Sequence, residues 1–232
     1  MSRTSALVAL REAAPLILPS LLLCDFGNLE REIERLDSAG VRALHLDVMD
    51  GNFVPNLTYG MPIAASIHKI SRMPLDIHLM IANPGRYVEQ FYTAGASLIT
   101  IHAEAVDDPP ALLQTIRELG AGAGIAVNPQ TPLSEIEDCV GHADLVLIMS
   151  VQAGFGGQRF NDVALEKLTE ARSMFGPDVI LEVDGGINEQ TISACTAAGA
   201  DWCVVGSAIF RQSDYSDAVQ RLLEAAGAAN TN

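Results

Sequence analysis

Short apolar runs rich in Leu, Ile and Val alternate along this chain with longer segments in which apolar residues recur at helical spacing. The short runs have the length of strands and are almost continuously apolar, which is typical of parallel strands buried on both faces. The segments between them, such as residues 28–40 and 163–176, have the pattern of helices. We predict eight strands, at residues 16–20, 43–49, 75–80, 97–102, 124–128, 145–150, 179–184 and 202–206.

Glycine follows several of the helical segments directly before the next strand, where it supplies the left-handed residue that ends a helix. These glycines are Gly40, Gly95, Gly120, Gly141 and Gly199. Eight strand–helix units in 232 residues predict an α/β fold, a single-domain (β/α)8 TIM barrel over residues 1–232 with 1–14 and 228–232 as terminal extensions. A doubly wound sheet is the alternative, but its first strand would be followed by a Gly-rich turn, and here the sequence is LLLCDFGN.

The composition allows a large core and narrows the range of partners. Hydrophobic residues make up 49% of the chain and charged residues 19%, while the formal net charge is −15. Such a surface disfavours nucleic acid and anionic membranes as partners. No apolar run is long enough to span a bilayer, and the first residues do not form a signal peptide. The cysteines form no C-x-x-C pair, which is typical of reduced thiols in a cytoplasmic protein.

Imidazole and carboxylate side chains stand at the carboxyl ends of three predicted strands. Alternation along residues 45–49 puts His45, Asp47 and Met49 on one face and apolar neighbours on the other. The apolar set suits packing against helices, so we expect the polar set inside the barrel. The same alternation predicts that His78 on the third strand and Asp184 on the seventh strand also point into the barrel. Barrel enzymes hold their active sites at this end.

Two imidazoles and two carboxylates at one barrel mouth predict a metal site. A single inward His is more often a hydrogen-bonded core residue. Two buried carboxylates beside two imidazoles would be costly without a shared cation, however. Zn²⁺, Mn²⁺ and Fe²⁺ all accept mixed nitrogen and oxygen ligands. We therefore predict a divalent metal bound by His45, Asp47, His78 and Asp184.

Other inward residues leave alternatives open. Asp76 and Glu182 lie one layer deeper, where they either orient the metal ligands or simply form hydrogen bonds in the core. Met49, Met80 and Met149 fall at strand ends near the predicted metal, where they either fill gaps in the core or form a dry pocket wall.

Glycine-containing turns follow the sixth, seventh and eighth predicted strands, with the sequences AGFGGQ (153–158), GGIN (185–188) and GSAIF (206–210). Backbone N–H groups at helix N-termini bind phosphate, and barrels often place such a site after strands seven and eight. One such turn would be an ordinary glycine turn, but three at the same end predict a phosphate site. Backbone dipoles would let this acidic protein bind an anion without Lys or Arg.

The order and combination of motifs resemble the ribulose-phosphate 3-epimerase family from about residue 15 to 210. The motifs are PS (19–20), HLDVMDGNFVPN (45–56), DIHLM (76–80), GFGGQ (154–158), DGGIN (184–188) and GSAIF (206–210). The resemblance implies a (β/α)8 barrel that interconverts D-ribulose 5-phosphate and D-xylulose 5-phosphate in the pentose phosphate pathway, acting as a homo-oligomer. It implies metal binding by the four residues predicted above and acid/base roles for Asp47 and Asp184. Substrate contacts are implied for Ser20, His78, Gly154, Phe155, Gly156, Gly157, Asp184, Gly185, Gly186, Gly206 and Ser207.

Two departures from the family pattern lie in loops near the expected substrate. Leu23 and Cys24 stand where the family usually has small residues, and Gln152 and Ala153 replace the pair that usually precedes GFGG. An allulose-6-phosphate 3-epimerase is therefore an alternative to the ribulose 5-phosphate enzyme.

Inversion at C3 of a ketose phosphate removes a proton on one face and returns one on the other, so it requires one carboxylate on each face. The metal is expected to polarise the C2 carbonyl and stabilise the enediolate. No nucleotide cofactor is expected. A metal-free phosphosugar isomerase or lyase would use a lysine, but Lys69 and Lys167 both lie in helical segments. A binder without catalytic activity would not need two acids facing a metal.

Overall fold

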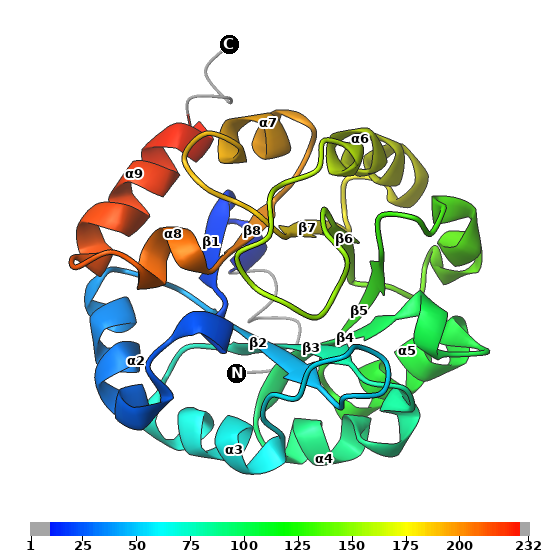
Figure 1. The fold of residues 1–232 in the computed structure, drawn as a ribbon. Helices are drawn as coiled ribbons and strands as arrows, with labels where there is room; N and C mark the ends of the chain where they lie inside the picture. Colours follow the sequence, from blue (N-terminus) through cyan, green and yellow to red (C-terminus); the bar gives the residue numbers. More distant parts are fainter. Residues whose placement is uncertain (1–9, 228–232) are drawn as a thin grey trace.

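The computed structural model describes residues 10–227, in which a ring of strands is enclosed by a ring of helices (Figure 1). Eight strands form one sheet in the order β1-β8-β7-β6-β5-β4-β3-β2, and all paired neighbours are parallel. A single parallel bridge between Ser20 and His45 joins the β1 side of the sheet to the β2 side. The strands are β1 (Leu16–Pro19), β2 (Leu44–Met49), β3 (Leu75–Met80), β4 (Ala96–His102), β5 (Gly122–Val127), β6 (Leu145–Met149), β7 (Ile180–Asp184) and β8 (Trp202–Val205). The predicted (β/α)8 barrel is confirmed.

Helices connect the strands on the outside of the barrel (Figure 1). The connection between β5 and β6 is a 3-10 helix, η5 (Leu133–Cys139), in place of an α-helix. The five glycines predicted to end helical segments all have φ between 78° and 108°. The α-helices are α2 (Leu29–Ser38), α3 (Met61–Ile70), α4 (Val88–Thr93), α5 (Pro109–Leu119), α6 (Val163–Phe175), α7 (Ile192–Ala197), α8 (Ser207–Phe210) and α9 (Tyr215–Gly227).

Two buried hydrophobic clusters follow the alternation of side chains along the strands. The outer cluster, between strands and helices, includes Leu46, Ile77 and Val183. The inner cluster fills the barrel and includes Leu147 and Trp202. Each fully buried Leu or Ile contributes about 1.5–3 kcal/mol through removal of apolar surface from water. The inward positions of the strands also hold buried polar side chains, which include Asp47 and His78 toward the strand ends and Asp76 and Glu182 deeper in the barrel.

The predicted terminal extensions fall largely outside the described residues, because 1–9 and 228–232 are not described. Of the described part, Leu10 is buried and belongs to the inner cluster. No helix within residues 10–227 has the length and apolar character needed to cross a membrane. All four cysteines are buried and form no disulfide.

Candidate active site

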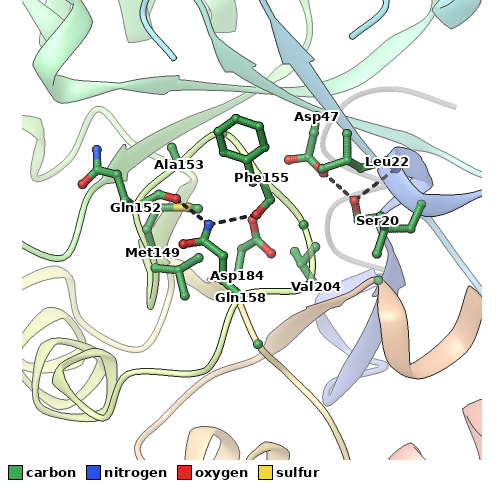
Figure 2. A pocket seen from close by; sticks show the side chains of 18 of the residues that line it. Ser20, Leu22, Asp47, Met149, Gln152, Ala153, Phe155, Gln158, Asp184 and Val204 are labelled. Atoms are coloured by element: carbon green, nitrogen blue, oxygen red, sulfur yellow. Dashed lines mark hydrogen bonds between the residues drawn. The ribbon is translucent and has the colours of Figure 1, made fainter. Parts of the chain in front are cut away.

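A cavity opens at the carboxyl ends of the strands (Figure 2). His45 and His78 lie below its surface, with no exposed area. Leu23, Gln152 and Ala153, which depart from the family pattern, also line it. The structure brings together at this cavity the other predicted site residues, which are Ser20, Asp47, Met49, Met80, Met149, Gly154, Phe155, Gly156, Gly157, Asp184, Gly185, Gly186, Gly206 and Ser207.

The four predicted metal ligands converge on one point. One ligand atom from each of His45, Asp47, His78 and Asp184 lies within 4.8 Å of the others. His45 Nε2 is 3.3 Å from Asp47 Oδ1, and His78 Nδ1 is 3.2 Å from the same oxygen. Two nitrogens and two carboxylate oxygens at this separation are the donor set expected for a divalent transition metal.

His45 is oriented for metal binding by a carboxylate deeper in the barrel. Its Nδ1 lies 2.6 Å from Asp76 Oδ2, while its Nε2 has no hydrogen-bond partner among the described residues. A His45 ring that donates its Nδ1–H to Asp76 can present a lone pair on Nε2 to the cluster. This is how carboxylates usually orient metal-binding imidazoles, so the site fits a cation. Of the two roles left open for Asp76, the contact favours orientation of the ligand.

Asp47 is held by residues that the sequence analysis identified only in part. The Ser20 hydroxyl donates to Asp47 Oδ2 (Figure 2). This contact leaves Asp47 Oδ1 facing the imidazoles of His45 and His78. The backbone N–H of Asp47 donates to the Tyr59 hydroxyl at 3.1 Å. The Thr58 hydroxyl donates to the Asp47 carbonyl at 2.7 Å and accepts from the Met49 N–H at 3.0 Å. The segment after β2 therefore fixes the strand end that carries Asp47.

The two aspartates differ in their affinity for protons. Burial acts to raise the pKa of Asp47, but the charges of the neighbouring His45 and His78 imidazoles outweigh it and hold that pKa below its usual value. Burial raises the pKa of Asp184 to about 7, and the nearby Asp47 carboxylate adds to the rise. Two carboxyl groups with pKa values on opposite sides of their usual range are suited to separate base and acid roles.

The imidazoles and the deeper carboxyl group are also shifted. Burial acts to lower the pKa of His45, but Asp47 and Asp76 outweigh it and raise that pKa well above its usual value. Burial lowers the pKa of His78. Burial, together with the charge of Asp76, raises the pKa of Glu182 well above its usual value. In the absence of a cation, the cluster therefore holds protons that a bound cation would displace.

Two residues that the sequence analysis missed extend the cluster beyond His78. His78 Nε2 lies 2.9 Å from His102 Nε2, and His102 Nδ1 lies 3.0 Å from Glu104 Oε2. The available signal was an H-x-E sequence at the end of the fourth predicted strand, where Thr100 and His102 share the inward face by alternation.

The methionines and the glycine turns occupy the places that their sequence positions predict. Met49, Met80 and Met149 belong to the inner cluster and also line the cavity, so core filling and a pocket wall are compatible here. Gly186 has φ 67°, and a Cβ on it would lie 2.3 Å from the Phe160 backbone nitrogen. Only glycine fits this turn, whose backbone is half-buried and lines the cavity.

Comparisons with known proteins identify relatives of this chain. The sequence profile of the ribulose-phosphate 3 epimerase family matches residues 16–210. The ribulose-phosphate 3-epimerase of Mycobacterium tuberculosis strain H37Rv is 45% identical over 219 residues, which cover 93% of this chain and 95% of that protein. The enzyme of the same name from Bacillus subtilis strain 168 is 41% identical over 210 residues, covering 89% and 97% of the two chains.

Solved structures of lower identity share the fold. The 3-hexulose-6-phosphate synthase of Salmonella typhimurium superposes with a TM-score of 0.69 at 17% identity, covering 92% of this chain and 99% of that one. Thiamine phosphate pyrophosphorylase from Pyrococcus furiosus gives a TM-score of 0.65 at 15% identity, covering 95% and 98%. At these identities the likeness establishes the barrel alone. The family profile and the curated relatives, which cover most of the chain, show that this protein is an enzyme of the ribulose-phosphate 3-epimerase family.

Proposed function

We propose that this enzyme inverts C3 of D-ribulose 5-phosphate to give D-xylulose 5-phosphate, using a divalent cation and two aspartates. The observation that carries the proposal is the convergence of two imidazoles and two carboxylates within 4.8 Å of one another. The names of relatives that are 41–46% identical to this chain support the substrate pair.

The proposed cation ligands are His45 through Nε2, His78 through Nδ1, and one carboxylate oxygen each from Asp47 and Asp184. A divalent cation supplies Lewis-acid chemistry, which at this position would draw electrons from the C2 carbonyl and make the C3 proton more acidic. Zn²⁺, Fe²⁺ and Mn²⁺ are all compatible with this donor set.

Asp47 and Asp184 are the proposed proton-transfer groups. They stand on β2 and β7, between which β8 and β1 lie in the ring, so they reach the cavity from different sides (Figure 2). A ketose phosphate bound between them would present one face of C3 to each. The lowered pKa of Asp47 suits a base and the raised pKa of Asp184 suits an acid, and the roles exchange in the reverse reaction.

The turns after β6, β7 and β8 are the proposed phosphate site. Gly154–Gly157, Gly185–Gly186 and Gly206–Ser207 line the same cavity as the two aspartates. Among the described residues, no Lys or Arg lines this cavity, so backbone N–H groups are the proposed phosphate donors.

A lysine-based barrel enzyme is a weaker alternative. Lys69 lies exposed on α3, and neither it nor Lys167 lines the cavity. The ammonium group of Lys167 donates to the backbone carbonyls of Asn128 and Thr131, which explains why it is buried. Allulose 6-phosphate is the stronger alternative substrate, because Leu23, Gln152 and Ala153 line the cavity and differ from the family pattern.

The resemblance to the family also supports a homo-oligomer that acts in the cytoplasm on a small sugar phosphate. A net charge of −15 disfavours nucleic acid and anionic membranes as further partners. Light scattering of the purified protein measures the assembly, and a monomer would contradict this part of the proposal.

Substrate preference tests the proposed reaction. We expect kcat/KM for D-ribulose 5-phosphate to exceed that for allulose 6-phosphate by about 10-fold or more, since one additional carbon must be accommodated. Free ribulose should be a poorer substrate still, because binding of the remote phosphate helps to orient the reacting carbon. A coupled assay on the three sugars measures this. Equal kcat/KM for free and phosphorylated ribulose would exclude the phosphate site.

Replacement of His78 tests the cation site. The His78→Ala variant should lose most of its bound divalent metal and most of its epimerase activity, because one of the proposed nitrogen ligands is removed. Metal analysis of the purified protein, together with the epimerase assay, measures both quantities. His68→Ala, which changes an exposed imidazole on α3, is the matched control and should keep both. Full metal content and full rate in His78→Ala would show that the ligand assignment is wrong.

The raised pKa of Asp184 predicts a pH-dependent effect on stability. Its folded-state pKa of about 7 lies above the ordinary value of 3.8, so protonated Asp184 favours folding at low pH. That contribution is lost as the pH rises through 7. Asp184→Asn stays neutral, so in the presence of a chelator it should gain stability relative to the wild type between pH 5 and pH 8.

Urea unfolding at the two pH values measures this gain. Asp107→Asn, at an exposed position, is the control and should show no such change. The same stability difference between Asp184→Asn and the wild type at both pH values would contradict the raised pKa.

Solvent exchange separates the roles of the two aspartates. Asp47→Asn and Asp184→Asn should each abolish net epimerisation in both directions, because every turnover needs both groups. One remaining carboxylate can still remove the C3 proton from one epimer and exchange it with solvent. Deuterium wash-in from D₂O, measured on each pure epimer, should therefore favour a different epimer in each variant.

Metal content must be measured first, because both residues are proposed ligands. Near wild-type net epimerisation by either metal-loaded variant would exclude the two-aspartate mechanism. Wash-in with the same epimer preference in both variants would show that the aspartates do not act on opposite faces.

A further inference from the structure

The second ring nitrogen of His78 points away from the candidate metal cluster, toward another buried imidazole. His78 Nε2 lies 2.9 Å from His102 Nε2, and neither side chain has exposed area. The two rings are stacked, with centroids 5.0 Å apart and an angle of 26° between their planes. A hydrogen bond between two nitrogens needs one donor and one acceptor, so only one of the two Nε2 atoms carries a proton.

The other side of His102 indicates which nitrogen carries the proton. His102 Nδ1 lies 3.0 Å from Glu104 Oε2, and a carboxylate only accepts hydrogen bonds. His78 Nδ1 lies 3.2 Å from Asp47 Oδ1, a second carboxylate oxygen that can accept a proton from that nitrogen when no cation is bound. With the proposed cation on His78 Nδ1, the His78 proton is on Nε2 and donates to His102 Nε2, and His102 carries its proton on Nδ1.

Glu104 is itself fixed by donors from the loop after β5. Its Oε1 accepts from the backbone N–H of Asn128 at 2.8 Å and from the Thr131 hydroxyl. These donors occupy Oε1 and leave Oε2 facing His102. The Phe53 ring, 4.8 Å from the His102 ring between centroids, lies against the imidazole. Hydrogen bonds thus connect Glu104, whose side chain is 25% exposed, through His102 to His78 in the interior.

We propose that His102 and Glu104 are positioning residues that keep the proton of His78 on Nε2 and its Nδ1 free to bind the cation. The inference rests on the proposed metal site. Neither residue lines the cavity, so both act through His78 and not on the substrate. Carboxylate or carbonyl partners usually orient metal-binding imidazoles directly, whereas here a second imidazole stands between carboxylate and ligand.

One competing arrangement is available. The Asn128 amide nitrogen lies 3.4 Å from His102 Nδ1. If it donated a hydrogen bond there, the direction of the hydrogen bond between His102 and His78 would reverse. His102 Nε2–H would then donate to His78, and the His78 proton would sit on Nδ1, pointing into the cluster. The carboxylate of Glu104 is closer than the amide and would face a lone pair in that arrangement. The geometry therefore favours Glu104 as the partner of His102 Nδ1.

Glu104→Gln is designed to force this reversal. The two donors at Oε1 should hold the amide oxygen, so the NH₂ group should take the Oε2 position and donate to His102 Nδ1. His78 would then be protonated on Nδ1. We expect the Zn²⁺ dissociation constant, measured by competition with a chelator, to rise about 10- to 100-fold. Glu135→Gln, an exposed position on η5 with the same change of charge, should bind Zn²⁺ as the wild type does.

Long-range ¹H–¹⁵N spectra of the Zn²⁺-loaded protein read the tautomers directly, and assignment is feasible because the chain has only five histidines. The loaded wild type should show His102 protonated on Nδ1, and chelator-treated Glu104→Gln should show His102 protonated on Nε2. A loaded wild type with His102 protonated on Nε2 would overturn the proposal, even where the variant does not fold.

Wild-type Zn²⁺ affinity in a folded Glu104→Gln variant would also overturn the proposal, while leaving the metal site itself intact. A wild type that binds no Zn²⁺, Fe²⁺ or Mn²⁺ would instead refute the metal site, and with it the positioning role. The two failures are therefore distinguishable.

Discussion

The cost of burying charge inside a closed barrel is the constraint on which the rest of this structure depends. Asp47 is only 3% exposed, and an isolated carboxylate at such a position would be strongly unfavourable. Its two oxygens face the Ser20 hydroxyl on one side and the imidazoles of His45 and His78 on the other. Each imidazole in turn needs a partner for its second nitrogen. The site is therefore a connected set of partners, built outward from one carboxylate.

The two imidazoles meet this need in different ways. His45 contacts Asp76 directly, within the barrel interior, where both side chains are fully buried. His78 reaches a carboxylate only through His102, and that carboxylate lies near the surface. Burial acts to raise the pKa of Glu104, but hydrogen bonds and charge from its neighbours outweigh it and lower that pKa to about 2. The hydrogen-bonded series from His78 therefore ends in a stable carboxylate. Removal of the Asp76 or the Glu104 carboxylate would leave a buried imidazole without its acceptor, which costs more free energy than the hydrogen bond itself contributes.

The sequence predicted the barrel well because parallel buried strands have few alternative patterns. The observed β3 matches its predicted bounds, and His45, Asp47 and His78 occupy the interior as alternation requires. The start of β5 was predicted at Gly124, two residues late, because the preceding Gly122 and its alanine neighbours resemble a turn. In the structure, Gly124 makes room for a neighbour, since a Cβ there would lie 2.2 Å from Thr100 Oγ1. Packing between strands, which local pattern does not contain, decides such positions.

The same limit explains why His102 and Glu104 were not identified. The H-x-E sequence resembles many strand ends, and its meaning depends on the register between β3 and β4. That register places His78 opposite Thr100 and shifts between Leu75 and Asp76, a local irregularity that no periodicity predicts. The sequence analysis could place Asp47 and Asp184 in one site, because alternation along each strand predicts by itself that the acid points inward near the end of β2 or β7. A contact between two imidazoles on adjacent strands has no signal of its own.

The protonation of Glu182 connects the core to the proposed cation. Asp47, Asp184 and Asp76 would bring three negative charges around one divalent cation, and an ionised Glu182 beside Asp76 would add a fourth in the same interior. Burial and the charge of Asp76 raise the pKa of Glu182, so it is held in its neutral form. A neutral Glu182 keeps the barrel interior close to charge balance when the cation is bound. It also leaves Asp76 as the single charged acceptor for His45 Nδ1, whose 2.6 Å contact is shorter than the 3.5 Å separation from Glu182. Proton placement on groups that do not line the cavity thus sets which nitrogen of His45 can offer a lone pair to the cluster.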